Sequence, residues 1–195
     1  MKNHIPLSIT EPGDIVLVSD KNSMLAKLIC RFSTTASDTS LSKFSHAAIV
    51  VSTGTTKNLI EALSTGVKRT SLSKYSNGYR ILIARHKGLS FFNKLSIIGS
   101  AEKYIGKKYG YKLLAGHFAD YLCSKITGRN VYYFRKITGN NNYPICSWVV
   151  SHAYDRAGLR FLNLDPDLVQ PDDIADEILH DQNNWEVAYH TAVKV

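Results

Sequence analysis

Cys146 is the residue in this sequence best suited to covalent chemistry. It follows Tyr143-Pro144-Ile145 and opens a segment with helical spacing that extends to Gly158. A helix N-terminus lowers the pKa of a thiol, because unpaired backbone N–H groups and the helix dipole favour negative charge. A thiolate placed there could attack the carbonyl of an amide or an ester. The alternative is a structural role, since most cysteines are small buried hydrophobic residues.

A nucleophilic cysteine needs a base, and His46 is the best candidate among seven histidines. It lies in an otherwise apolar segment, residues 45–51, where an unpaired imidazole would be costly. If residues 53–54 form a two-residue hairpin loop, His46 lies directly opposite Glu61 in the next strand. We therefore predict His46 as the general base and Glu61 as the carboxylate that orients it. A purely structural histidine–glutamate pair is the alternative.

The other histidines are weaker candidates. His152 lies on the same predicted helix as Cys146, but about 240° around its axis. His117 is predicted on the polar side of its own helix. Four more have no nucleophile nearby: His4, His86, His180 and His190.

The elements that must position these residues follow an order of strands first and helices after. Period-two or continuously apolar segments predict strands at residues 14–18, 44–51, 59–63, 80–85 and 185–193. Helical spacing predicts helices at residues 23–32, 91–105, 111–126 and 146–158. This order predicts an α+β fold with an antiparallel sheet packed against helices.

The predicted helix at residues 111–126 places its apolar stripe on Leu114, Phe118, Tyr121, Leu122 and Ile126. Basic residues accompany it and the segment that follows: Lys112, Lys125, Arg129, Arg135 and Lys136. Residues 132–134 add aromatic area. Such a mixture can stack on nucleic-acid bases, but core aromatics with solvated charges are the simpler interpretation.

Length and composition exclude several classes of protein. The 195 residues, 44% hydrophobic and 21% charged, suit one folded domain covering residues 1–195. No apolar segment is long enough to span a membrane, and residues 1–25 resemble no cleavable signal. We therefore expect a cytoplasmic protein, or one exported without such a signal. Three distant cysteines, with no Cys-x-x-Cys or His-x-x-x-His spacing, predict neither a disulfide framework nor a zinc site.

The net charge of +8 is unevenly distributed. Residues 163–186 hold eight of the 16 acidic residues and no Lys or Arg, so residues 1–162 form a strongly basic body. This asymmetry is typical either of a solvated basic face or of attraction to an anionic partner.

Several segments together resemble a known family. They are Gly13-Asp14-Ile15-Val16-Leu17, Ser45-His46-Ala47-Ala48-Ile49-Val50, Ile60-Glu61-Ala62 and Cys146-Ser147-Trp148-Val149-Val150-Ser151-His152-Ala153-Tyr154 with Gly158-Leu159. In this order the sequence is similar to the circularly permuted NlpC/P60 group, the YiiX-like branch of papain-like amidases, in which the histidine strand precedes the cysteine helix.

The resemblance implies a papain-like fold, with Cys146 as nucleophile, His46 as base and Glu61 as the third member. Ile105-Gly106-Lys107-Lys108-Tyr109 resembles the family's Gly-x-Pro-Tyr segment, which makes Tyr109 a candidate oxyanion donor. Departures are Lys108 for proline, Ile145 for an aspartate, Trp148 for a glycine, and a helical insert at residues 110–144. We expect that insert to form a lid or a substrate wall.

The resemblance also implies an activity. We expect a cysteine amidase or peptidase that needs no metal or cofactor and acts on an anionic substrate, bacterial cell-wall peptide first, with delivery as a toxin as one use. The alternatives are hydrolysis or acyl transfer on an acyl lipid, and a non-catalytic binding module. Nucleic-acid binding is the weakest of these hypotheses, because no nucleic-acid motif is present.

Overall fold

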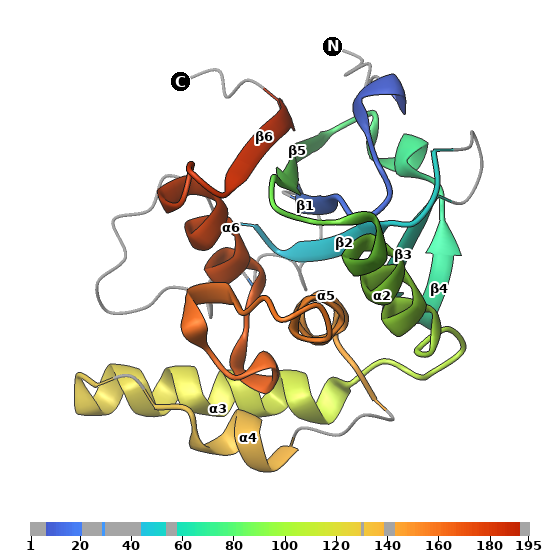
Figure 1. Ribbon diagram of the computed structural model, residues 1–195. Helices are drawn as coiled ribbons and strands as arrows, with labels where there is room; N and C mark the ends of the chain where they lie inside the picture. Colours follow the sequence, from blue (N-terminus) through green and yellow to red (C-terminus); the bar gives the residue numbers. More distant parts are fainter. Residues whose placement is uncertain are drawn as a thin grey trace.

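The structure, a computed structural model, describes residues 7–20, 29, 44–53, 58–129, 131–138 and 143–191. In this part of the chain six strands form one antiparallel sheet in the order β4-β3-β2-β1-β5-β6 (Figure 1). The strands are β1 (Ile15–Asp20), β2 (His46–Val50), β3 (Leu59–Leu63), β4 (Gly66–Thr70), β5 (Tyr79–His86) and β6 (Trp185–His190). The helices are α2 (Phe91–Glu102), α3 (Tyr111–Thr127), α4 (Tyr133–Thr138), α5 (Cys146–Asp155) and α6 (Pro171–His180). Short 3-10 turns are η1 (Leu7–Ile9), η2 (Leu72–Tyr75), η3 (Phe161–Asn163) and η4 (Pro166–Leu168). The predicted α+β class is confirmed.

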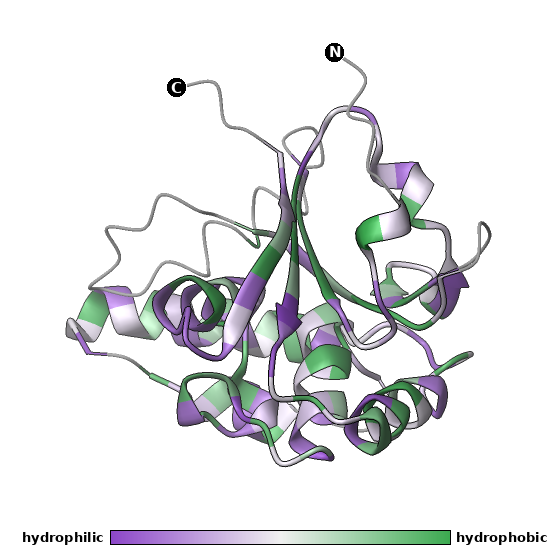
Figure 2. Cartoon of the chain, turned by 45° about the horizontal axis from the view of Figure 1, so that its top comes forward, coloured by the Kyte–Doolittle hydropathy of each residue, from purple (hydrophilic) through white to green (hydrophobic). Residues whose placement is uncertain are grey.

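The sheet is buried on both of its faces. Because strand side chains alternate, Ile15 and Leu17 of β1 join one hydrophobic cluster, and Val16 and Val18 join another. The first cluster includes α5, and the second includes Leu72 and Tyr75 of η2. Figure 2 shows hydrophobic residues along the central strands and mixed hydropathy on the helices. This explains why β1 is a continuous apolar run.

Helix α5 lies between the sheet and α3 (Figure 1). At its far end, the Tyr154 hydroxyl donates to the carbonyl of Gly13, 2.5 Å away. Along one side, the hydroxyls of Ser147 and Ser151 donate to the carbonyls of Val169 and Pro166, each at 2.8 Å. These buried polar contacts fix the position of the helix more narrowly than hydrophobic packing alone would.

The hairpin between β2 and β3 differs from the prediction. Val50 pairs with Leu59, so residues 53–54 do not form a two-residue loop and His46 does not lie directly opposite Glu61. The observed register is shifted by two positions. Because side chains alternate with period two, this shift leaves both residues on the same face of the sheet. His46 and Glu61 are therefore neighbours as predicted, although the predicted register is wrong.

Helix α3 begins where the sequence predicts, but it buries a different face. Phe118, Leu122 and Ile126 of the predicted stripe are exposed, and the residues it buries are Leu113, Gly116, His117 and Asp120. Asp120 accepts hydrogen bonds from the backbone N–H groups of Phe134 and Arg135 and from the Arg135 guanidinium at 2.8–2.9 Å. The polar face turns inward because α4 supplies these partners.

Three of these strands and helices were not predicted, namely β4, α4 and α6. The helix predicted at residues 23–32 lies outside the described residues, apart from Ile29. The final strand begins at Trp185 as predicted and pairs with β5. None of the helices described is both long and apolar enough to cross a membrane.

Candidate active site

Cys146 is the first residue of α5, and its thiol lies at the helix N-terminus. No side chain caps this helix end. Backbone N–H groups of Ala47 and Ser147 hydrogen-bond to the sulfur. The side chain is 3% exposed and lines a cavity of about 470 Å³. The thiol is therefore shielded from bulk solvent but has open volume in front of it.

His46 lies at the start of β2, where two contacts fix the strand. The N–H of Phe44 donates to Oδ1 of Asp172 in α6 at 2.7 Å, and the Ser45 hydroxyl donates to the carbonyl of Val18. The His46 side chain lines the same cavity as Cys146 and hydrogen-bonds to it. Its Nε2 lies 2.5 Å from Oε2 of Glu61, which leaves Nδ1 for the thiol. The structure thus brings together the three residues singled out in the sequence.

Glu61 is fully buried and has more partners than His46 alone. The Tyr75 hydroxyl donates to Oε2 at 2.5 Å, and the Thr70 hydroxyl and the Lys74 ammonium donate to Oε1. A buried carboxylate is stable only when its oxygens are satisfied in this way. Sequence reasoning missed Thr70, Lys74 and Tyr75 as partners of Glu61, because neither β4 nor η2 was predicted.

The pKa shifts of Glu61, His46 and Cys146 all favour the charged form of the side chain. Burial opposes ionisation of Glu61, but hydrogen bonding and attraction from His46 and Lys74 hold its pKa well below 4.5. Burial likewise favours neutral His46, yet the Cys146 sulfur and Glu61 raise its pKa to about 10. For Cys146 the burial effect is again outweighed, and His46 with the two backbone N–H groups lowers its pKa below 9.0. These shifts favour the ion pair of a thiolate and an imidazolium over the neutral pair.

Tyr109 lines the same two cavities as the thiol. Its segment is bracketed by backbone bonds, from Val67 N–H to the Lys107 carbonyl at 2.9 Å and from Gly110 N–H to the Pro144 carbonyl at 3.1 Å. Position 110 has room only for glycine, since a Cβ on Gly110 would lie 2.0 Å from the Tyr143 carbonyl oxygen. Tyr109 is 7% exposed and lines the cavity with Cys146, and burial raises its pKa. A neutral hydroxyl near the thiol can donate a hydrogen bond.

The remaining histidines have other surroundings. His152 stacks on Trp148 with ring centroids 3.7 Å apart and hydrogen-bonds to Asp167 at 2.8 Å, so it points away from the thiol as predicted. His117 lies on the polar side of its helix as predicted, but that side is buried, and its Nδ1 lies 3.2 Å from the Gln170 side chain. His117 also lines a small pocket of about 20 Å³ beside Cys146. It faces inward because the polar side of α3, which includes Asp120, is the side packed against the rest of the protein.

Residues of the predicted insert reach the site. Leu114 and His117 of α3 line the small pocket together with Cys146, and a role of the insert as a lid or a substrate wall stays a prediction. Among the described residues, no three His, Cys, Asp or Glu side chains converge as metal ligands would. The arrangement suits nucleophilic attack by sulfur, with proton transfer through an imidazole.

The ion pair predicts how the thiol reacts with pH. We expect iodoacetamide to alkylate Cys146 with a midpoint below pH 9.0, because only the thiolate reacts and His46 stabilises it. In His46→Gln the midpoint should move upward. Rates are measured by mass spectrometry of the peptide that holds Cys146, with Cys123 of the same protein as the internal reference. Equal midpoints in the two proteins would show that no such ion pair exists.

Comparison with known proteins identifies the family. No curated protein matches the chain. A family model described as a permuted papain-like amidase enzyme, YaeF/YiiX, C92 family, matches residues 9–135. The match includes His46, Glu61 and Tyr109, continues through most of the predicted insert, and ends before Cys146. Its length, well over half of the chain, confirms the resemblance to a permuted papain-like fold: the chain belongs to the permuted papain-like amidase family.

Proposed function

We propose that this protein is a thiol amidase in which Cys146 is the nucleophile, His46 the general acid and base, and Glu61 the group that holds the imidazole. The observation that carries the proposal is the hydrogen-bonded series Cys146–His46–Glu61, which begins at a helix N-terminus and opens into a cavity. The non-catalytic alternative does not explain why a thiol, an imidazole and a buried carboxylate form a hydrogen-bonded series at a cavity wall.

The geometry supports a two-step reaction. The Cys146 thiolate attacks the amide carbonyl, and the oxyanion that forms accepts hydrogen bonds from the Cys146 backbone N–H and the Tyr109 hydroxyl. The His46 imidazolium gives its proton to the amine as the C–N bond breaks, which leaves a thioester on the enzyme. Water, losing a proton to His46, then attacks the thioester, releases a carboxylic acid and restores the thiolate.

The cavities favour a polar substrate over a long acyl chain. The apolar pocket beside Cys146 is only about 20 Å³, room for a group the size of one water molecule. The larger cavity has apolar lining residues such as Val18 and Leu63, but it also presents hydroxyl, imidazole and ammonium groups, which the small pocket mostly lacks. Among amides these features suit a peptide, and bacterial cell-wall peptide is the substrate that we propose, ahead of acyl lipids.

A panel of amides tests the proposed function. Purified protein is incubated with muropeptides and, separately, with N-acyl lipids of matched concentration, and released amines are quantified. We expect turnover of muropeptides by the wild type and none by Cys146→Ala. Turnover of lipids alone would overturn the substrate class. If Cys146→Ala retained full turnover, the assigned nucleophile would be wrong.

A further inference from the structure

A second cavity of about 480 Å³ adjoins the first. The two share Ser64 and Thr65 in the turn between β3 and β4, and they share Tyr109. The Tyr111 hydroxyl donates to the carbonyl of Ser64 at 3.1 Å, which ties the start of α3 to this common rim. A molecule with its reacting carbonyl at Cys146 could therefore extend past Tyr109 into the second cavity. Its size is ordinary for a ligand pocket.

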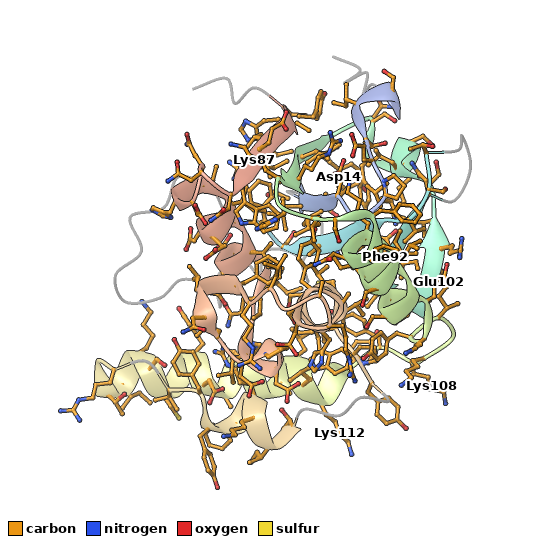
Figure 3. All side chains as sticks on the ribbon, in the orientation of Figure 1. Asp14, Lys87, Phe92, Glu102, Lys108 and Lys112 are labelled. Carbon is orange, nitrogen blue, oxygen red and sulfur yellow. The ribbon has the colours of Figure 1, made fainter. Side chains whose placement is uncertain are left out.

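Two lysines give the second cavity a positive charge. Lys108 precedes Tyr109, Lys112 lies in the first turn of α3, and Figure 3 shows both on the same side of the molecule. Neither forms an ion pair with any residue that the structure describes. Among the described residues, those that line this cavity include no carboxylate. Lys112 also stands where the helix dipole is already positive, so its charge is not offset locally.

The rest of the lining suits a ligand with a flat or apolar part beside its charge. Tyr111 and Tyr143 are about half exposed and form walls of this cavity. Tyrosine presents an apolar ring and a hydroxyl that can donate to an anion. Lys108 and Lys112 have no carboxylate partner among the described residues, whereas Glu61 neutralises the charge of Lys74 in the first cavity.

We propose that Lys108 and Lys112 form a subsite for an anionic group of the substrate, a carboxylate or a phosphate. This group belongs to the portion of the substrate that extends past Tyr109 into the second cavity. This inference deepens the proposed function and rests on it in taking Cys146 as the reacting atom. Lys108 and Lys112 would select substrates by charge, and both lie away from the bond that breaks.

Maleimides that differ only in their tails test the subsite. Three probes carry tails of equal length that end in a carboxylate, a phosphonate or an uncharged carboxamide. Alkylation of Cys146 is followed by peptide mass spectrometry in wild type, in Lys108→Gln/Lys112→Gln and in Lys136→Gln. Lys136 is an exposed lysine of α4 that lines neither cavity, so its variant tests the effect of removing a positive charge elsewhere on the surface. The neutral tail corrects each protein for thiol reactivity, and circular dichroism checks folding.

We expect the wild type to react about 10-fold faster with at least one anionic tail than with the neutral tail, a ratio that salt reduces. The double variant should lose most of this ratio, and Lys136→Gln should keep it. A faster reaction with the carboxylate tail indicates a peptide carboxylate as the ligand, and a faster reaction with the phosphonate tail indicates a phosphate head group. Equal rates for all tails, or the same loss in Lys136→Gln, would overturn the subsite. Because alkylation needs no amide cleavage, it can fail or succeed independently of the muropeptide assay.

Discussion

Replacing Cys146 with serine is expected to lower kcat/KM for amide hydrolysis at least about 1,000-fold, equivalent to ~4 kcal/mol of transition-state stabilisation. Serine keeps the size of the side chain but not its acidity. At Cys146 the helix N-terminus, His46 and two backbone N–H groups together lower the thiol pKa. A hydroxyl is too weak an acid to become an anion under the same influences, so the nucleophile is lost while the fold is kept.

Cys123→Ser provides the matched control for this experiment. Cys123 is a partly buried cysteine of α3 that lines neither cavity beside Cys146. Its replacement should leave kcat/KM within about twofold of the wild-type value, since it touches no reacting group. Comparable losses in the two variants, or full activity in Cys146→Ser, would show that hydrolysis does not pass through a Cys146 thioester.

The second large effect is expected from Glu61→Gln, which should reduce both stability and activity. The side chain is completely buried, and Tyr75, Lys74 and His46 all make contact with its carboxylate. Removing one partner of a buried charged group costs about 3–5 kcal/mol, because the other charges are left uncompensated. Activity should fall about 100-fold or more, since the imidazole loses the carboxylate that orients it. Urea unfolding and steady-state kinetics measure the two effects.

The pH dependence of stability gives a sharper form of this test. The pKa of Glu61 lies below 4.5 in the folded protein, so its charge stabilises the fold above about pH 4.5 and this contribution is lost as the pH falls. The difference in unfolding free energy between wild type and Glu61→Gln should therefore narrow in acid. Glu102→Gln is the control, because the Arg69–Glu102 pair is solvent-exposed and worth about 0.5 kcal/mol or less. A difference that stays constant from pH 7 to pH 3 would contradict the burial of an ionised Glu61.

The sequence predicted the candidate site better than the hairpin that carries part of it. His46 and Glu61 were paired through an assumed two-residue loop, and the real register is shifted by two positions. The pairing survived because a shift of two preserves the face of a strand, whereas a shift of one would have separated the two side chains. Chemistry, a histidine and a glutamate in apolar strands that each need a partner, was the stronger constraint.

Periodicity failed where partners from distant segments decide which face is buried. Phe118 and Leu122 indicated one face of α3, yet Asp120 faces inward because Arg135 and the start of α4 satisfy it. Helix α6 was missed because four of its ten residues are acidic, although Ile174 and Ile178 supply its buried side. Edge strand β4 was missed because it is short and half exposed. None of these partners can be read from a local window of sequence.

The contact between Phe44 and Asp172 has a consequence for the time at which the protein becomes reactive. It fixes the start of β2, next to His46, with a residue made long after Cys146, and the carbonyls that hold α5 in place come from the same late segment. The contact between Phe44 and Asp172 joins residues 128 positions apart, and contacts this distant in sequence are slow to form. A ribosome-bound chain that ends before α6 therefore carries the thiol and the imidazole without the supports that align them. The Cys146 thiol of the nascent chain should not gain this reactivity until α6 has emerged from the ribosome.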